Sequence, residues 1–186
     1  MTATAAPFGV SPVYHPSGDI RMRTSYKIAS AYGTGLYTGS PVKLTTDGTL
    51  IATATGADSF IGIFMGCQFI SNNRPFILPY WPAGQTYDVN TEMTAWIAPN
   101  DGLAEFEAQL NGTAASTIIG EAINLATASG GSIYTGISSQ SLNATTTGAT
   151  PGTFIVTGLA PYANNAWGDA FPIVRVKAGT IQGPVA

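Results

Sequence analysis

Glu105 and Glu107 are the two side chains of this sequence whose spacing best suits catalysis. In a β-strand, residues two apart point to the same side and lie about 6–7 Å apart. That distance is near the lower end of the range that separates the carboxylates of inverting glycosidases. Such pairs are common on the solvated faces of strands, and no other motif predicts a cleft around this one. We therefore expect no catalytic role for either glutamate.

The sequence holds one histidine, His15, and one cysteine, Cys67. A single histidine excludes a metal site built from several imidazoles, and the carboxylates lack the spacing of a calcium-binding loop. Any nucleophile activated by histidine would need His15, and no serine lies in a nucleophile elbow. Cys67 lies in the apolar segment 60–69, so we expect a buried, unreactive thiol. The sequence thus predicts neither an enzyme nor a metal site.

The glycines between residues 33 and 39 partly match a nucleotide-binding motif. The stretch Gly33-Thr-Gly-Leu-Tyr-Thr-Gly39 has one residue more than the dinucleotide fingerprint. The fingerprint also requires a helix after the glycines, because its N-terminal amides bind the pyrophosphate. Here Ser40-Pro41 and an alternating strand pattern follow, so we expect a glycine-rich turn and no cofactor.

Charged residues are scarce: only 17 of the 186 residues, or 9%, are Asp, Glu, Lys or Arg. An average soluble domain is about 25% charged. With a net charge of −3 and a mean hydropathy of +0.18, a free monomer is weakly protected against association. This composition favours a surface that other subunits cover. The alternative is a neutral surface rich in serine and threonine.

The few basic residues argue against nucleic acid as a partner. Arg21, Arg23 and Lys27 form the nearest thing to a cluster, which is too small for strong phosphate binding. Residues 1–10 lack the basic and apolar regions of a signal peptide, and no apolar run approaches a membrane span. We therefore expect a soluble protein made in a cytoplasm, with no membrane partner.

Residues 1–20 are predicted to form an extended N-terminal arm. Proline lacks a backbone donor and fixes φ, so Pro7, Pro12 and Pro16 exclude a helix and disfavour a central strand. Four apolar side chains give the arm anchors on its own domain or on a neighbour: Phe8, Val10, Val13 and Tyr14. We expect the prolines to keep the arm out of the sheet, so that the remaining core folds without it.

The core, residues 21–186, is predicted to be all-β. About ten short strands with turns every 8–12 residues are typical of a β-barrel or β-sandwich. We expect one unit, with two small β-units, 21–100 and 101–186, as the alternative. Asp47-Gly48 predicts a hairpin, and residues 116–124 can hold one helical turn. The expected strands are 26–29, 42–45, 49–53, 60–69, 74–80, 92–98, 103–110, 133–137, 153–159 and 171–177.

Aromatic side chains in two proline-bounded loops are the best remaining functional signal. Tyr80 and Trp81 lie in one loop and Trp167 in the other. Such side chains anchor protein interfaces, stack on sugars, or close the end of a barrel, and the sequence leaves these three roles open. The residues we predict at a subunit or capsid interface are Phe8, Val10, Val13, Tyr14, His15, Tyr80, Trp81 and Trp167.

Several segments together resemble small virion structural proteins of tailed bacteriophages. They are Gly9–Gly18, Phe60–Cys67, Tyr80–Gly84 and Asn165–Val176. The stretch Gly39-Ser-Pro-Val-Lys-Leu-Thr-Thr-Asp-Gly48, followed by Ile61-Gly-Ile63, also resembles capsid decoration (cement) proteins. Ser40 stands where those proteins usually carry an acidic residue. The resemblance covers most of the chain, in turn-and-strand motifs.

The resemblance implies a non-catalytic all-β protein bound to the capsid exterior of a virion and made in a bacterial host cytoplasm. Its partners would be the major capsid protein and further copies of itself, with a trimer expected and a dimer as the alternative. It would stabilise the capsid by bridging shell subunits. Trp81 and Trp167 keep open a second role, as a glycan- or receptor-binding module on the virion surface.

Overall fold

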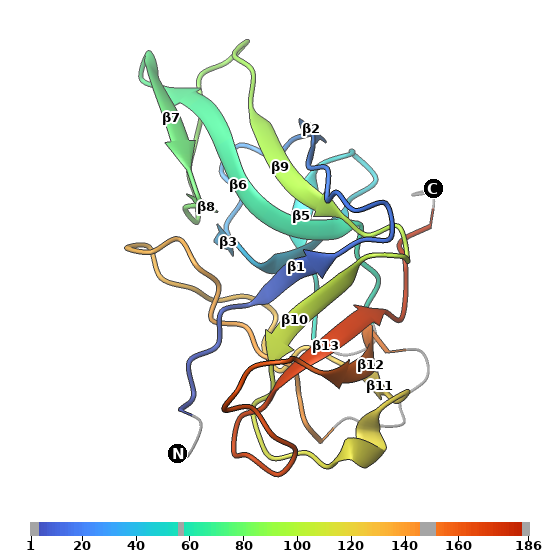
Figure 1. Cartoon of the computed structure of the whole chain (residues 1–186). Coiled ribbons are helices and arrows are strands. Elements are labelled where there is room, and N and C mark those ends of the chain that lie inside the picture. Colours follow the sequence, from blue (N-terminus) through green and yellow to red (C-terminus); the bar gives the residue numbers. More distant parts are fainter. Residues whose placement is uncertain (1–3, 56–57, 146–151, 184–186) are drawn as a thin grey trace.

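The computed structural model describes residues 4–55, 58–145 and 152–183 and shows an all-β protein made of antiparallel sheets (Figure 1). The first sheet, here the β10 sheet, has the order β1 (Val10–Tyr14), β10 (Glu105–Gln109), β13 (Ile173–Ala178), β12 (Phe154–Leu159) and β11 (Ala122–Ile123). The second, the β6 sheet, has the order β2 (Arg23–Tyr26), β9 (Thr94–Pro99), β6 (Gly62–Ser71), β4 (Ser40–Leu44) and β5 (Leu50–Ala52). The predicted all-β class is confirmed.

Four further elements complete the set in the described residues. Strand β7 (Arg74–Leu78) pairs with the second half of β6, and β3 (Leu36–Tyr37) pairs with β8 (Tyr80–Trp81). A 3-10 turn, Ser116–Ile118, precedes β11, at the place where the sequence predicts one helical turn. Apart from β1, the strands of the β10 sheet begin after residue 104 and those of the β6 sheet end by residue 99.

Two hairpin turns show how local sequence directs the β6 sheet. The predicted Asp47-Gly48 turn joins β4 to β5, with Gly48 at φ +72° and Leu44 opposite Leu50. Asn72 and Asn73 both have positive φ, the conformation that a tight hairpin turn requires, and they join β6 to β7. The Asp88 carboxylate accepts both of their backbone N–H groups, at 2.8 and 2.7 Å.

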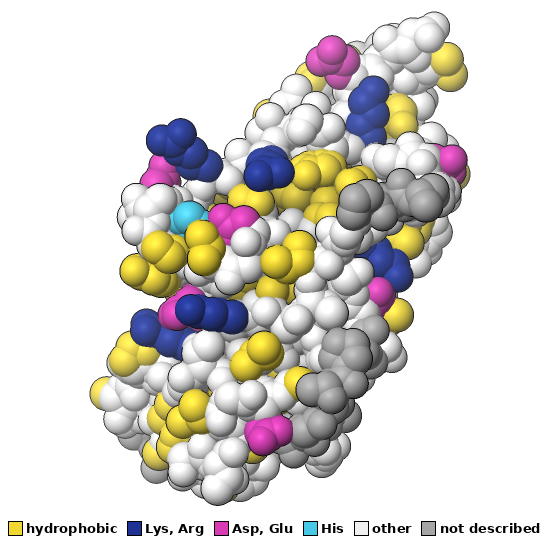
Figure 2. Space-filling model, turned by 90° about the vertical axis from the view of Figure 1, so that its right-hand side faces the viewer, with side chains coloured by type: hydrophobic (Ala, Val, Ile, Leu, Met, Phe, Trp, Pro, Cys, Tyr) yellow, Lys and Arg dark blue, Asp and Glu magenta, His cyan; other side chains and the backbone are white. Residues whose placement is uncertain are grey.

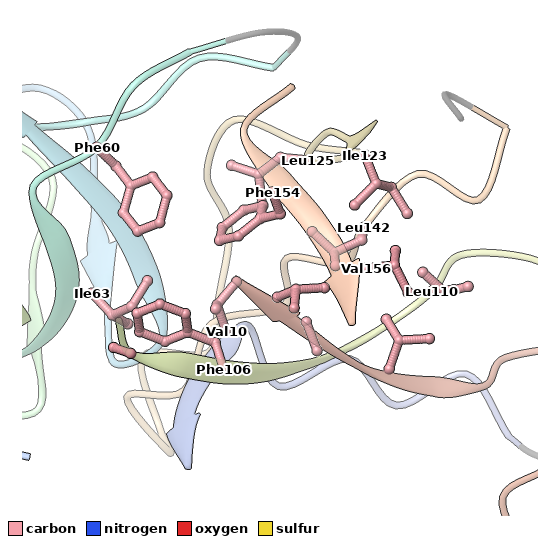
Figure 3. Packing of buried hydrophobic residues seen from close by; sticks show 14 of the residues in the cluster. Val10, Phe60, Ile63, Phe106, Leu110, Ile123, Leu125, Leu142, Phe154 and Val156 are labelled. Atoms are coloured by element: carbon pink, nitrogen blue, oxygen red, sulfur yellow. The ribbon is translucent and has the colours of Figure 1, made fainter. Parts of the chain in front are cut away.

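The hydrophobic residues form two clusters. One lies within the β6 sheet and includes Trp81, Phe64 and Phe69. The other lies between the β10 sheet and the start of β6, where Phe60 contacts Phe154 and Phe106 at ring-centroid distances of 4.9 and 6.1 Å (Figure 3). Because Phe60 belongs to the segment that leads into β6, this second cluster holds the two sheets together.

Strand β1 corrects the expectation that prolines keep residues 1–20 out of the sheet. Residues 10–14 form the outermost strand of the β10 sheet, and Val10 is 1% exposed within its core. The Val10 N–H donates to Gly39 O at 2.8 Å and so points away from β10. Backbone N–H groups alternate sides along an antiparallel strand, so residues two apart point theirs to the same side. The nitrogen of Pro12 therefore also faces away from β10, so the proline costs no ladder hydrogen bond.

One predicted strand is absent. Residues 133–137 lie in an irregular loop, because Gly130, Gly131 and Gly136 let the chain turn back on itself. The other nine predicted strands each overlap an observed one. The ambiguous stretch 103–110 is indeed a strand, β10. No separate strand was predicted at β3, β8 or β11, which have two residues each.

Candidate interaction surface

Glu105 and Glu107 point to the same side of β10, as their spacing predicts, and each pairs with a cation directly opposite on β13. Glu105 lies 3.4 Å from Lys177 Nζ and Glu107 lies 3.2 Å from Arg175 Nε. Tyr162 donates its hydroxyl to the other Glu107 oxygen at 2.6 Å. Both carboxylates thus stabilise the face of the sheet, which agrees with a structural role.

His15 connects the end of β1 to the segment between β9 and β10. Its Nε2 lies 2.8 Å from Asp101 Oδ2, and its Nδ1 lies 2.6 Å from Ser17 Oγ. The Ser17 backbone N–H also donates to Nδ1, which assigns the imidazole proton to Nε2 and directs it at Asp101. A pocket of about 280 Å³ adjoins this group and is lined also by Arg21 and Arg23.

The serine–imidazole–carboxylate order is that of a catalytic triad, but the local geometry is that of a tight turn. Gly18 N–H donates to His15 O at 2.9 Å, so Ser17 approaches His15 because the chain reverses there. Two Ser17 donors share the single Nδ1 lone pair. The group therefore fastens the arm to Asp101. In Figure 2 the histidine, in cyan, lies beside an acidic side chain.

Hydrogen bonds set the pKa of Asp101. Burial of the carboxyl raises its pKa, but N–H groups of Leu103 and Ala104 and the imidazole of His15 donate to the carboxylate. Together these donors outweigh burial and hold the pKa of Asp101 below its ordinary value. The charged form of Asp101 is thus part of the fastening.

Cys67 is buried in the β6 sheet, as predicted. Its Sγ lies 3.5 Å from the Tyr80 carbonyl oxygen. Burial raises the pKa of the thiol to about 12, because a thiolate would be poorly solvated there. The thiol is therefore protonated at neutral pH and is a poor nucleophile.

Trp81 and Val10 are buried in this structure, although the sequence predicts both at an interface. Pairing of β8 with β3 turns the Trp81 indole into the core, where it is 0% exposed and packs against Phe69 and Tyr87. Val10 lies in the other cluster. The sequence could not reveal either result, because each depends on pairing with a distant strand.

The remaining predicted residues are accessible to different degrees. Val13 and Tyr14 are 37% and 51% exposed, whereas Phe8, His15, Tyr80 and Trp167 are half-buried. Tyr80 stacks on Tyr37 with ring centroids 5.9 Å apart. Trp167 packs against the β10-sheet core and lines a shallow pocket of about 320 Å³. No single patch gathers all of them.

An uncharged groove lies where the N-terminal arm meets the connection between β3 and β4 and the loop that contains Ile137. Its volume is about 200 Å³, and part of its wall is Val10 at the foot of β1. The other residues that line it are Phe8, Ser11, Pro12, Thr38, Gly39, Met65 and Ile137. None of these side chains carries a charge, so an apolar group can enter without burying an unpaired ion.

The 126–141 loop, residues 126–141, presents the most exposed aromatic side chain of the described chain. Tyr134 is 93% exposed and its neighbour Ile133 is 55% exposed. Neither exposed side chain was predicted, because residues 133–137 were expected to form a strand. The glycines on either side of this segment were the available signal for a projecting turn.

Hydrogen bonds hold this loop in one shape. Ser132 N–H donates to Ile137 O at 3.0 Å, and Gly136 N–H donates to Ser132 O at 2.7 Å. The Ser132 hydroxyl accepts the N–H of Tyr134 at 3.2 Å. Thr38 N–H donates to Gly136 O at 2.9 Å, which attaches the loop to the groove. Tyr134 is therefore displayed from an ordered loop.

Comparisons with protein-family models, with curated proteins and with solved structures found no match. Within residues 4–55, 58–145 and 152–183, no helix is long and apolar enough to cross a membrane.

Proposed function

We propose that this chain is a structural virion protein that binds the outside of a bacteriophage capsid and stabilises it by bridging shell subunits. The observation that carries the proposal is an uncharged contact surface, made of the groove and the ordered 126–141 loop beside it. The resemblance of several sequence segments to phage decoration proteins supports the same role. The major capsid protein is the proposed partner, and the virion exterior the proposed location.

The exposed surface suits many weak contacts. Fourteen large apolar side chains are exposed among the described residues, almost as many as the 17 charged residues of the whole chain. Figure 2 shows one face, on which charged side chains (dark blue and magenta) are scattered among apolar side chains in yellow and white backbone and uncharged side chains. Uncharged contacts lose little solvation energy on burial, and symmetry repeats each contact around a shell, so avidity replaces single-site affinity.

Order in the 126–141 loop favours binding further. A loop whose backbone is already held in place loses less conformational entropy when a partner covers it. Tyrosine is also enriched among the residues that contribute most to protein interfaces. The Ser132 hydroxyl holds the backbone N–H of Tyr134, so an ordered main chain presents this exposed ring.

The receptor-binding alternative loses one of its two aromatic supports. It rested on Trp81 and Trp167 as sugar-stacking platforms, and Trp81 is 0% exposed. Trp167 alone, half-buried in a shallow pocket, gives a smaller platform. The decoration role is therefore the better supported of the two.

The test mixes purified protein with undecorated shells of the source particle. We expect saturable binding at hundreds of copies per shell and a higher disruption temperature of the shells. Binding at a few copies per particle would favour the receptor-binding role instead. Absence of both binding and thermal protection would overturn the proposal.

A further inference from the structure

The exposed tip and the apolar groove are neighbours on the same chain. Ile137 lines the groove and lies only three residues after Tyr134 at the tip of the 126–141 loop. Thr38, which also lines the groove, pairs with Ile137 through an isolated bridge. The loop therefore forms one wall of the groove and also carries the side chain that projects beside it.

We propose that the chain self-associates by placing Tyr134 of one copy in the groove of a second copy. Each copy then donates one tip and receives one, and such contacts form a closed ring when the rotation between copies returns to the first copy. A two-fold axis gives a dimer and a three-fold axis gives a trimer. This inference concerns contacts between copies and does not require a capsid.

Electrostatics favours a second copy as the occupant. A charged patch that meets its own copy places like charges together, which costs energy. The groove lining and the Ile133–Tyr134 tip contain no charged side chain, so no such cost arises here. The groove, at about 200 Å³, exceeds the 150 Å³ or so that holds a benzene ring. The Ser11 hydroxyl in the lining supplies a partner for the phenol.

The area involved matches a weak but specific association. An aromatic side chain buries about 150–250 Å², and the groove that receives it loses a similar area. Two such contacts give roughly 600–1,000 Å². Ile133, Ile137 and their surroundings bring the total near the ~1,000 Å² that a biological interface needs. The expected association is therefore concentration-dependent in the micromolar range or above.

Analytical ultracentrifugation over a range of concentrations tests the proposal. We expect the wild type to form a dimer or trimer and Tyr134→Ser to dissociate with a constant about 30-fold higher, the effect of losing an interface hot spot. Val89→Ser is the matched control, because Val89 is 86% exposed at a site away from the groove and the tip. Its association should equal that of the wild type.

Disulfide trapping gives an independent readout that does not depend on stability. Ile133→Cys and Ser11→Cys variants, mixed and oxidised, should form a covalent dimer between copies, whereas Val89→Cys with Ser11→Cys should not. The native Cys67 is buried and does not interfere. A wild type that stays monomeric at the highest concentrations, or a Tyr134→Ser variant that associates as strongly as the wild type, would overturn the inference. Neither experiment involves shells, so its failure is separate from failure of the decoration role.

Discussion

Gly9 and Gly39 cross at backbone contact distance, with no room for a side chain on either residue. A Cβ on Gly9 would lie 2.6 Å from Gly39 O, and a Cβ on Gly39 would lie 2.8 Å from Phe8 O. Both residues have positive φ, +79° and +94°. This crossing brings the Val10 N–H onto Gly39 O and so joins the N-terminal strand to the β6 sheet.

The crossing predicts that Gly39→Ala destabilises the protein by at least about 2 kcal/mol, because a left-handed backbone costs an L-residue ~1–2 kcal/mol and a clash adds to it. Urea unfolding measures the change. Gly18→Ala is the matched control: its φ is +80°, but a Cβ there meets nothing within 4 Å. Gly18→Ala should lower the free energy of unfolding by only ~1 kcal/mol. Equal effects of the two substitutions would show that the crossing is not tight.

Burial of Val10 predicts that the arm is part of the fold. Val10→Ala should lower the free energy of unfolding by about 2 kcal/mol, whereas Val13→Ala, at a 37% exposed position, should change it by less than ~0.5 kcal/mol. The pairing of β1 with β10 predicts the effect of removing the arm. A chain that lacks residues 1–20 should lose its cooperative unfolding transition, since Phe106 and Ala108 of β10 would lose their edge strand. A sharp, wild-type-like transition in that chain would contradict the assignment.

The sequence predicted structure that depends on neighbouring residues, but not structure that depends on pairing between distant strands. Alternating apolar positions and the Asp47-Gly48 turn are local signals, and both predicted the observed hairpin. Burial of Trp81 is not local, because it depends on β8 pairing with β3. Proline composition suggested an arm outside the sheet. It could not show that the nitrogen of Pro12 faces away from β10, where the ring is tolerated.

The candidate surface was predictable only in part. Phe8 was expected at an interface and does line the groove. Apolar and polar residues alternate from Ile133 to Ile137 as in a strand, so the pattern did not predict the exposed Tyr134. The glycines at 130, 131 and 136 favour a turn, and the structure has a turn there. The Asp101 partner of His15 is far away in sequence, and no spacing rule could have joined them.

Hydrogen bonding to the Glu107 carboxylate raises the pKa of Tyr162, so the neutral phenol stabilises the fold. A raised pKa contributes stability that is present below the ordinary pKa of about 10 and is lost as pH rises through the folded pKa. Ultraviolet absorbance should show a tyrosine that ionises above the ordinary pKa of about 10, and Tyr162→Phe should remove that step. Tyr134→Phe, which removes an exposed phenol, should leave it in place.

The lowered pKa of Asp101 predicts sensitivity to acid. A depressed carboxyl pKa contributes stability that is present above the ordinary value of about 4 and is lost as pH falls through the folded pKa. Asp101→Asn should therefore be less stable than the wild type at neutral pH, and the difference should shrink in acid. Asp19→Asn is the control, because its pair with Arg21 is exposed and such pairs contribute little. A difference that stays constant with pH would exclude this role.

A thiol with a pKa of about 12 predicts that Cys67 resists alkylation in the native protein. Iodoacetamide at neutral pH should modify it only after denaturation, as mass spectrometry of the intact chain can show. Val89→Cys adds an exposed thiol and should react at once, which confirms that the reagent is active. Rapid modification of native Cys67 would mean that the β6 sheet opens readily.

Because Val10 on β1 lies opposite Ala108 on β10, β1 leaves the ribosome long before the strand with which it pairs. Contacts so distant along the chain form slowly, and until they form, Phe8, Val10 and Tyr14 stay uncovered on a nascent polypeptide. During biosynthesis residues 8–14 are thus open to chaperones until β10 is made, and a pause in translation before residue 105 would prolong that exposure.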